Sequence, residues 1–545
     1  MSTPSANSVV SGRIDPAGDY RVDALLEGTQ WGGQAGKPVS LDYSFPTGGA
    51  NWASGYGDGE PGSLTALTPQ QQAAAVNALA AWSAVANVVF HPVDDTADRV
   101  GDIRFASTSV NGIKNSQAYA YSPSNAPEGG DVWLNPSAYW DGYNAGDYGY
   151  MTYMHEVGHA LGLSHPFGGS VSGDVLPTAQ DSYNNSLMSY TALAGHGGSY
   201  VNFNPTTPML YDIAAIQYLY GANTSFRAGD DTYTFYQGQS YYQTLWDGGG
   251  NDTIIWSATS QGATIDLRGG HWSDLGNPLQ FNDQNGKPLA TVDNDVAIYF
   301  TVTIENAVGG AVNDTLIGNE AANRLNGNGG NDTLQGNQGN DTLDGGAGID
   351  VAVYNGAYRN YALGRTGTAL TVGDKTGPDG NDTLNQVERL HFSDGWFAVD
   401  LAPNEPGWDA ALLLGALAGP LALSNAALVG VFLDYFSTPL AGAATTAAGN
   451  NQPTLLDGAN RLLALNTPRE LAGSASNAAL VNLLYTNITG AAPDAGTLAS
   501  YTSLLDSQTL TQAQLLVAAA ELPLNQTHVG LTGLAATGLQ YTPPL

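Results

Sequence analysis

Residues 154–165 read M-H-E-V-G-H-A-L-G-L-S-H and hold three of the eight histidines in the chain. On a helix, His155 and His159 lie four residues apart, so both imidazoles leave the same face at a separation that one metal ion bridges. Gly162 permits the left-handed conformation that ends a helix, and the chain can then return His165 as a third nitrogen ligand. Three neutral imidazoles with an open fourth position are typical of catalytic zinc, whereas a structural site usually uses thiolates, and the chain has no cysteine.

Glu156 follows the first histidine directly and is placed to contact a water molecule rather than the metal. Zinc acidifies water, so we predict that Glu156 is the general base that takes the proton from a metal-activated water before it attacks a substrate. The alternative is that these are ordinary histidines of an amphipathic helix. The extended spacing of all three histidines and the glycine disfavours that alternative.

The full pattern HExxHxxGxxH, with Pro166 after the third histidine and the segment Ser-Leu-Met188-Ser-Tyr190 downstream, resembles the metzincin metalloproteases and, among them, the serralysins. The resemblance covers about residues 20–400. It implies a zinc endopeptidase of broad specificity, in which Met188 forms the apolar turn beneath the histidines. It also implies that Tyr190 is a reversible zinc ligand that leaves the metal and donates a hydrogen bond to the oxyanion.

A third motif of the resemblance is an edge strand that binds extended substrates by main-chain hydrogen bonds, and Ala118, Tyr119 and Ala120 match it. An ordinary sheet strand is the alternative reading, and the two readings are compatible.

The composition favours cations over nucleic acid as partners. The chain has 49 acidic and 16 basic residues and a formal net charge of −33, so a phosphate backbone would be repelled. Apolar residues make up 42% of the 545 residues, which is enough for buried cores.

Local patterns predict the elements that position the metal motif. Thr68, Pro69 and Gln71 form the start signal of a helix that continues to about Val85, and a second helix ends at Gly221. Alternating or apolar runs predict strands over residues 39–45, 102–106, 118–121 and 131–134. Together they predict an α/β protease domain over residues 21–222.

Five nine-residue units follow one another from Gly309 to Val353: GGAVNDTLI, GNEAANRLN, GNGGNDTLQ, GNQGNDTLD and GGAGIDVAV. They fit the RTX nonapeptide pattern of a parallel β-roll, in which six residues form a turn and three form a strand with one inward apolar residue. Turn carbonyls and the acid at position six offer hard oxygens to calcium. The predicted ligands are Gly309, Asp314, Gly327, Gly329, Asp332, Gly336, Asp341, Gly345 and Asp350.

Asn323 replaces the acid of the second unit and Val312 replaces a glycine of the first, which weakens the expected sites there. The serralysin resemblance implies further calcium ligands near the domain boundary: Arg227, Gly229, Asp231, Asp247, Gly249, Gly250, Asp252, Thr303 and Glu305. Asp231 stands where the family usually has Thr, and a main-chain ligand should tolerate that change. Several structural calcium ions are expected to act as folding ligands.

The resemblance to serralysins ends near residue 400. Residues 410–433 carry no charge and are long enough to span a membrane, but Gly419-Pro420 and Ser424-Asn425 interrupt them, so two short buried helices are expected. We predict an all-α extension over residues 401–545, loosely similar to a helical domain of unknown function found on RTX proteins. No stable membrane insertion is expected.

Residues 1–20 lack the charged and apolar regions of a Sec signal peptide, so we expect export by a type I secretion machinery, with a signal within the last sixty residues. By resemblance, residues 1–20 are a leader or propeptide cut before about Arg21.

The predicted protein is a multidomain α+β chain: a leader (1–20), a metzincin domain (21–222), a calcium-binding RTX β-roll (223–400) and a helical extension (401–545). It would be a secreted, calcium-stabilised zinc endopeptidase that acts on extracellular proteins and peptides. The alternative is a calcium-dependent surface or adhesion protein with a vestigial protease domain, in which residues 401–545 bind a cell-surface partner.

Overall fold

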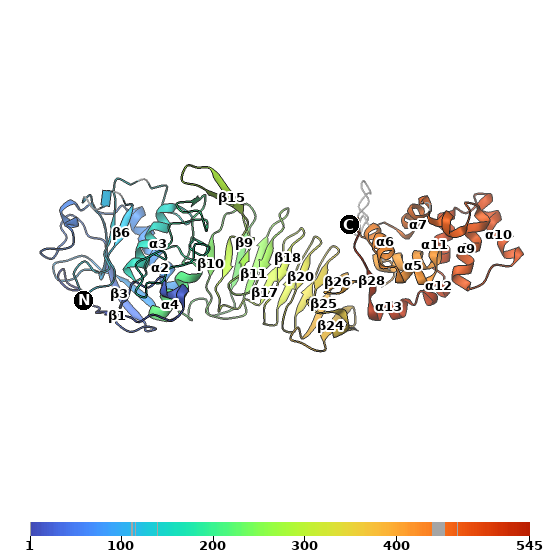
Figure 1. The fold of residues 1–545 in the computed structure, drawn as a ribbon, viewed down its shortest axis with the longest axis horizontal. Helices are drawn as coiled ribbons and strands as arrows, with labels where there is room; N and C mark the ends of the chain where they lie inside the picture. Colours follow the sequence, from blue (N-terminus) through green and yellow to red (C-terminus); the bar gives the residue numbers. More distant parts are fainter. Residues whose placement is uncertain are drawn as a thin grey trace. The chain divides into compact units, whose positions relative to one another are not determined.

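The computed structural model describes residues 2–110, 113–114, 116–138, 140–438, 453–465 and 467–544. The chain forms two compact units, residues 1–259 with 263–306 and residues 260–262 with 307–545 (Figure 1). The domain boundaries predicted near residues 222 and 400 fall inside these units. Strand β8 (Tyr200–Val201) pairs with β14 (Leu279–Asn282) across the first boundary, and β27 (Gly395–Ala398) pairs with β28 (Leu539–Tyr541) across the second.

A five-stranded sheet forms the frame of the first unit. Its order is β4 (Val88–Pro92), β3 (Val39–Ser44), β5 (Ile103–Ser107), β7 (Val132–Leu134) and β6 (Ala118–Ala120). The first four strands are parallel, and β6 is antiparallel to β7 at the edge. The strands predicted at these positions are confirmed, and β4 was not predicted.

Three helices accompany this sheet: α2 (Pro69–Val85), α3 (Tyr148–Ala160) and α4 (Leu210–Tyr220). The predicted start of α2 is confirmed, because Thr68 and Gln71 form a reciprocal capping box. The indole of Trp82 is fully buried and donates a hydrogen bond of 3.0 Å to the Met154 carbonyl, which fixes α2 against α3. Short elements α1 (Tyr20–Asp23), η1 (Glu60–Ser63), β1 (Ser11–Arg13) and β2 (Thr29–Trp31) complete this region.

The segment predicted as a leader lies against the five-stranded sheet. Ser2 and Ser8 donate side-chain hydrogen bonds to the buried carboxylate of Asp102. The Asn7 amide donates to carbonyls of the turn between β6 and β7, at 3.3 Å to Ser124 and 3.1 Å to Gly129. Side chains near the start of the chain are thus hydrogen-bonded to the sheet and to the turn between β6 and β7. Cleavage of the chain before Arg21 stays a prediction.

The remainder of the first unit is built from short strands. Two pairs are parallel, β9 with β11 and β10 with β16, and β14 forms antiparallel pairs with β15 and β8. Their bounds are β9 (Thr232–Tyr236), β10 (Gln243–Leu245), β11 (Thr253–Ser257), β12 (Thr264–Asp266), β13 (Trp272–Ser273), β15 (Pro288–Val292) and β16 (Val296–Ile298).

In the second unit the nonapeptide units form three-residue strands that alternate between two parallel stacks. One stack pairs β18, β20, β22 and β26, and the other pairs β19, β21 and β25. The bounds are β17 (Asn306–Val308), β18 (Thr315–Ile317), β19 (Arg324–Asn326), β20 (Thr333–Gln335), β21 (Thr342–Asp344), β22 (Val351–Val353), β25 (Asn381–Asn385) and β26 (Arg389–Phe392). Between β22 and β25 along the chain come η3 (Tyr358–Asn360) and the hairpin of β23 (Tyr361–Thr366) and β24 (Ala369–Asp374), and β24 pairs with β25 in an antiparallel manner.

The predicted division into six turn and three strand residues is confirmed for these five units. The central residue of each strand is fully buried, as predicted: Leu316, Leu325, Leu334, Leu343 and Ala352. Positive φ angles occur at position two in Asn328 (68°) and at position four in Gly330 (119°). The fourth and fifth units have positive φ at the same two positions, whereas the first two units have none, so the feature common to all five units is the one buried apolar residue per strand.

The residues after 400 form the helices shown in orange and red in Figure 1. They are α5 (Pro406–Ala418), η4 (Pro420–Ser424), α6 (Ala426–Ser437), α7 (Leu455–Ala464), α8 (Thr467–Ala472), α9 (Asn477–Thr489), α10 (Ala495–Asp506), α11 (Gln512–Ala520), α12 (Pro523–His528) and α13 (Leu531–Thr537). The uncharged stretch forms two short helices, as predicted. Within the described residues, no helix is both long and apolar enough to cross a membrane.

The prediction of an all-α extension omits strand β28, which is antiparallel to β27 and joins the stack of the nonapeptide strands. Leu539 and Tyr541 are buried with 1% and 8% exposure. A side chain at Gly430 would collide with the carbonyl of Thr542, so this glycine lets the terminal segment pass close to α6. The pairing partner lies more than 140 residues away, which a local pattern does not reveal.

We expect a chain that ends at residue 538 to lose stability in the second unit. The deletion exposes the β27 edge and removes two buried side chains worth about 3–6 kcal/mol together, on the order of 10 °C in melting temperature. Calorimetry checks this expectation, and a chain that ends at Thr542 is the matched control. Equal melting temperatures for the two truncated chains would contradict the structural role of β28.

Candidate active site and metal centres

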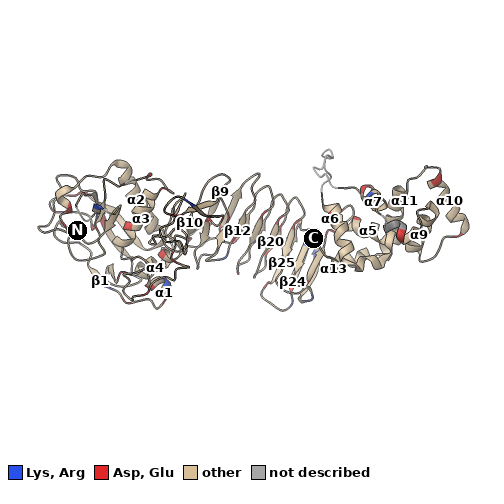
Figure 2. Cartoon of the chain, turned by 45° about the horizontal axis from the view of Figure 1, so that its top comes forward, with Lys and Arg blue, Asp and Glu red and all other residues tan. Residues whose placement is uncertain are grey.

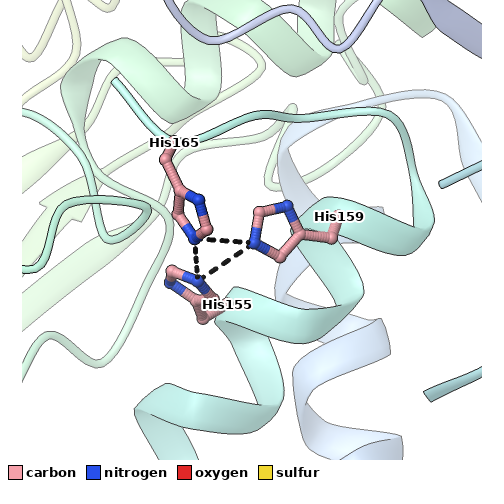
Figure 3. A group of neighbouring side chains, drawn as sticks. All are labelled: His155, His159 and His165. Carbon is pink, nitrogen blue, oxygen red and sulfur yellow. Dashed lines mark hydrogen bonds between the residues drawn. The ribbon is translucent and has the colours of Figure 1, made fainter. Parts of the chain in front are cut away.

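Three imidazoles converge at the end of α3 (Figure 3). The Nε2 atoms of His155, His159 and His165 lie 3.1 to 3.2 Å from one another. Three ligands at about 2.0–2.1 Å from one tetrahedral ion have a similar mutual separation. Gly162, with φ at 106°, reverses the chain after α3, and a Cβ there would collide with the Thr29 carbonyl. The residues present therefore fit a zinc ion.

The protons of two of these rings are held on the far side. His155 Nδ1 lies 2.9 Å from the Leu187 carbonyl and His159 Nδ1 lies 2.8 Å from the Leu163 carbonyl, so each Nδ1 donates. Their Nε2 lone pairs then face each other and His165, an arrangement that a cation stabilises. Burial and the neighbouring imidazole of His165 lower the pKa of His155 to about 4, and burial lowers the pKa of His159 well below its usual value. Both rings are neutral, as metal ligands must be.

Glu156 is buried next to this cluster, with 5% exposure, and its Oε2 has no hydrogen-bond partner among the described residues. Burial raises the pKa of Glu156 to about 8. A buried carboxylate without donors is unfavourable unless a nearby cation or water compensates it. Its position suits a proton acceptor rather than a structural acid.

Tyr190 lies over the histidines. Its ring centroid is 4.6 Å from that of His165 and 5.6 Å from that of His155. The residue is 58% exposed, and burial, together with the charge of Glu156, raises the pKa of its hydroxyl to about 12. Because of this raised pKa, the Tyr190 phenol keeps its proton near neutral pH and can donate a hydrogen bond. Phe167 stacks on His165, with the ring centroids 5.0 Å apart and an interplanar angle of 9°.

Met188 lies beneath α3, where a Cβ on Gly158 would come within 2.7 Å of its sulfur. The turn that carries Met188 is fixed by Asp212 at the start of α4. This carboxylate accepts hydrogen bonds from Ser186 Oγ at 2.6 Å and from the Leu187 amide at 2.8 Å. Leu187 in turn orients His155, so Asp212 reaches the metal ligand through two hydrogen bonds.

The predicted substrate-binding residues Ala118, Tyr119 and Ala120 are strand β6, at the edge of the sheet. The buried carboxylate of Glu60 accepts hydrogen bonds from the hydroxyls of Tyr119 at 2.6 Å and Tyr121 at 2.5 Å. These two bonds hold the edge strand from one face of the sheet.

The predicted calcium ligands of the first unit gather around three carboxylates. Oxygen atoms of Asp231, Asp247 and Asp252 lie within 4.8 Å of one another. Asp252 is fully buried, and its Oδ2 has no hydrogen-bond partner among the described residues. The Asp252 amide donates to Glu305 at 2.8 Å. Asp231 was expected to contribute through its main chain, yet its carboxylate belongs to this cluster.

The other members of that predicted set differ in how they relate to the cluster. Gly249 donates its amide to Asp247 at 2.7 Å, and a Cβ on Gly250 would collide with the Gly229 carbonyl. Arg227 has a left-handed backbone with φ at 48°, and its guanidinium lies 4.5 Å from the centroid of the Tyr233 ring. The predicted ligand of Arg227 is its main-chain carbonyl, and this assignment stays a prediction. Thr303 is exposed.

In the second unit the acids at position six form a ladder. The main-chain amide of Asp314 donates a hydrogen bond to the Asp332 carboxylate, and the amide of Asp332 donates one to the Asp350 carboxylate, both at 2.7 Å. The two partners of each bond lie eighteen residues apart along the chain. The Oδ2 atoms of Asp332, Asp341 and Asp350 are buried without hydrogen-bond partners among the described residues.

The predicted glycines of this region surround the same oxygens. At Gly309 a Cβ would lie 2.5 Å from Asp314 Oδ2 and 2.8 Å from the Gly327 carbonyl. A Cβ would likewise meet the acid of the same unit at the other predicted first-position glycines, Gly327, Gly336 and Gly345. Gly329, at position three, forms a parallel bridge to Ala347 instead. Carboxylate and carbonyl oxygens thus form cradles of the kind that calcium occupies.

Both ladders end on acids that the repeat pattern did not assign as ligands. Asp341 donates its amide to Asp382 at 2.9 Å, and Asp350 donates to Glu388 at 2.9 Å. Asp382 precedes Thr-Leu as in the repeats, which was a usable signal. Glu388 precedes Arg-Leu after a hairpin insertion and gives no such signal.

Comparison with known proteins places these features in a family. Residues 63–179 match the Matrixin model, residues 145–232 the Met-zincin model, and residues 212–366 the model of the peptidase M10 serralysin C terminal. Serralysin of Proteus mirabilis is 36% identical over 352 residues, which cover 57% of this chain and 67% of the relative. Metalloprotease AprA of Pseudomonas entomophila is 34% identical over 347 residues, covering 58% of this chain and 66% of the relative.

The fold and the three-histidine site define a zinc metalloendopeptidase of the metzincin class. The chain belongs to the serralysin family, in agreement with the resemblance found in the sequence.

We expect Asp212→Asn to weaken the metal centre although Asp212 lies outside it. The side-chain amide introduced by this substitution places a donor or a weaker acceptor opposite the main-chain amides of Leu187 and Met209, which reduces the folding free energy by about 1–3 kcal/mol. Zinc affinity, measured by competition with a chelator, should fall together with the melting temperature. The exposed Asp174→Asn is the charge-matched control, and unchanged zinc affinity in Asp212→Asn would refute this positioning role.

Replacement of Glu60 by Ala should affect substrate binding more than turnover. It leaves the hydroxyls of Tyr119 and Tyr121 without their acceptor and frees the edge strand, at a cost of about 1–3 kcal/mol. Steady-state kinetics on an extended peptide should show a higher KM at nearly constant kcat. The exposed Asp98→Ala is the control, and a fall in kcat with KM unchanged would exclude this explanation.

Proposed function

We propose that the chain is a secreted endopeptidase of broad specificity that cleaves extracellular proteins and is stabilised by calcium. The observation that carries the proposal is the unpartnered carboxylate of Glu156 beside three imidazole nitrogens that point to one centre. Serralysins of the same family support the peptidase activity.

In the proposed mechanism, His155, His159 and His165 would hold the zinc ion, which would supply Lewis-acid polarisation of the peptide carbonyl and acidification of water. Glu156 accepts the proton of the attacking water and later delivers it to the leaving amine. The Tyr190 hydroxyl donates a hydrogen bond to the oxyanion, and it would also serve as a reversible ligand of a bound zinc ion.

Substrate binding is assigned to strand β6. An extended peptide would add to this edge through main-chain hydrogen bonds, which accept many side-chain sequences. The small side chains of Ala118 and Ala120 leave the edge accessible. This arrangement accounts for broad specificity.

Calcium is assigned a folding role. The buried acids of both units, Asp252 and Asp332 among them, lack compensating charge, so the folded state needs cations. A chain that folds only with calcium would remain extended in a cell with low free calcium and would fold after export. We therefore propose type I secretion, and the absence of cysteine agrees with folding that needs no oxidation.

Glu156→Gln should lower kcat/KM on casein or a peptide by about 10²–10⁴-fold while one zinc ion per chain is retained. Metal analysis and hydrolysis are measured together in millimolar calcium, with the exposed Glu320→Gln as control. Full activity in Glu156→Gln would remove Glu156 as the base. A wild type that binds zinc but cleaves nothing, even without residues 1–20, would support the alternative of a surface protein with a vestigial protease domain.

A further inference from the structure

The three histidines of the metal centre differ in what holds each ring from behind. The Nδ1 atoms of His155 and His159 each donate to a main-chain carbonyl, at 2.9 and 2.8 Å. His165 has no such acceptor, because its side-chain hydrogen-bond contacts within the described residues are those of Nε2 to the other two rings. His165 also comes from a loop, whereas His155 and His159 project from one helix (Figure 3). The orientation of the His165 ring therefore needs another cause.

The ring of Phe167 stands where that support is missing. Its centroid lies 5.0 Å from the centroid of His165, and the two planes are nearly parallel, at 9°. Of the ring pairs that the described residues form at the metal centre, this pair is the most nearly parallel. Offset-stacked aromatic rings attract each other at centroid separations of roughly 4.5–7 Å. A flat ring against one face of the imidazole resists rotation of His165 about its Cβ–Cγ bond.

The backbone fixes this stacking. The Gly168 amide donates to the His165 carbonyl at 3.3 Å and closes a turn. Pro166 occupies the second position of the turn, which its fixed φ favours, and Phe167 occupies the third. The Pro166 carbonyl accepts a hydrogen bond of 2.7 Å from the Leu176 amide, which ties the turn to the rest of its loop. The loop thus carries the ligand and the ring that stacks on it as one piece.

Phe167 is not a core residue. It is 46% exposed, and its other ring contact among the described residues is with Tyr190, at 5.1 Å and an angle of 48°. Lys and Arg are sparse along the chain (Figure 2), and no described guanidinium lies over the Phe167 ring. The nearly parallel contact of Phe167 is therefore the one with the predicted metal ligand.

Tyr190 also lies against His165, with the ring centroids 4.6 Å apart and an angle of 57°. In the proposed mechanism, the Tyr190 hydroxyl is a reversible ligand that donates a hydrogen bond to the oxyanion. A residue that moves during turnover does not hold His165 throughout the reaction. Phe167 is independent of that movement, because the turn at Pro166 fixes it.

We propose that Phe167 is a positioning residue for the third zinc ligand, and that stacking on its ring replaces the hydrogen-bond acceptor that His155 and His159 have. The orientation of the His165 ring sets the direction of its Nε2 lone pair, and residues that orient metal ligands contribute to metal affinity. Without Phe167, the His165 ring would be ordered only when the metal binds, which weakens binding. The inference rests on the zinc site of the proposed function and adds a support to it.

The test measures zinc affinity of the full chain by competition with a chelator in millimolar calcium. We expect the affinity to fall about 2- to 12-fold in Phe167→Ala, the factor for ordering one side chain on binding. Phe167→Leu keeps an apolar side chain without a flat face and should fall similarly, whereas Phe167→Tyr should retain the wild-type affinity. Val175→Ala is the control, because Val175 is an apolar residue of the same loop with 49% exposure. Wild-type affinity in Phe167→Ala or Phe167→Leu would overturn the proposal.

The melting temperature of the zinc-free chain separates orientation of the ligand from general stability. Because Phe167 is about half exposed, zinc-free Phe167→Ala should melt within about 3 °C of the wild type. A large fall in this melting temperature that accompanies the loss of zinc affinity would contradict a positioning role. It would show that the substitution disturbs the loop as a whole.

Steady-state kinetics at saturating zinc separates positioning of His165 from substrate binding. With the metal site filled, Phe167→Ala should keep the wild-type KM for an extended peptide. A higher KM with unchanged zinc affinity would overturn the proposal and assign Phe167 to substrate binding. A wild type that binds zinc but cleaves nothing would contradict the proposed function, while the comparison of zinc affinities would still decide the role of Phe167.

Discussion

Buried lone pairs that face each other without protons or donors between them are the constraint on which this structure depends. Three imidazole nitrogens lie 3.1 to 3.2 Å apart in the first unit, and carboxylate oxygens of Asp252, Asp332 and Asp350 are buried without partners. Burial of such groups is strongly unfavourable unless a cation neutralises them. In the proposed function, zinc and calcium ions would supply this neutralisation.

The two kinds of site solve this constraint differently. The zinc ligands are neutral imidazoles fixed by carbonyl acceptors on their far side, which preserves the open position that catalysis needs. The calcium candidates are charged and are spaced by a repeat that places one acid per coil at equal intervals. A neutral, rigid site tolerates an exchangeable substrate or water, whereas a row of charges requires ions to stay bound.

The sequence predicted features whose parts are close together along the chain. The histidine spacing, the capping box at Thr68 and the six-plus-three division of the nonapeptides each depend on neighbours within about one or two turns, so a local pattern records them. Asp212 and Glu60 were missed because their hydrogen-bond partners lie 25 and 59 residues away. Phe167 was missed because stacking on His165 depends on the turn after the motif. Strand β28 was missed because nothing near Leu539 indicates a partner at Ala398.

The excess of acid over base acquires a physical meaning from this distribution. Surface acids alone would be screened by salt and would cost little. Here a share of the 49 acids is buried in ordered positions, where screening is weak and each uncompensated charge opposes folding. A net charge of −33 that includes such buried acids opposes the compact state, and the calcium ions of the proposed function would offset part of that charge. The proposed zinc site consists of neutral imidazoles and the proposed calcium sites consist of carboxylates, so the proposed function places the need for charge compensation in the coils rather than at the catalytic centre.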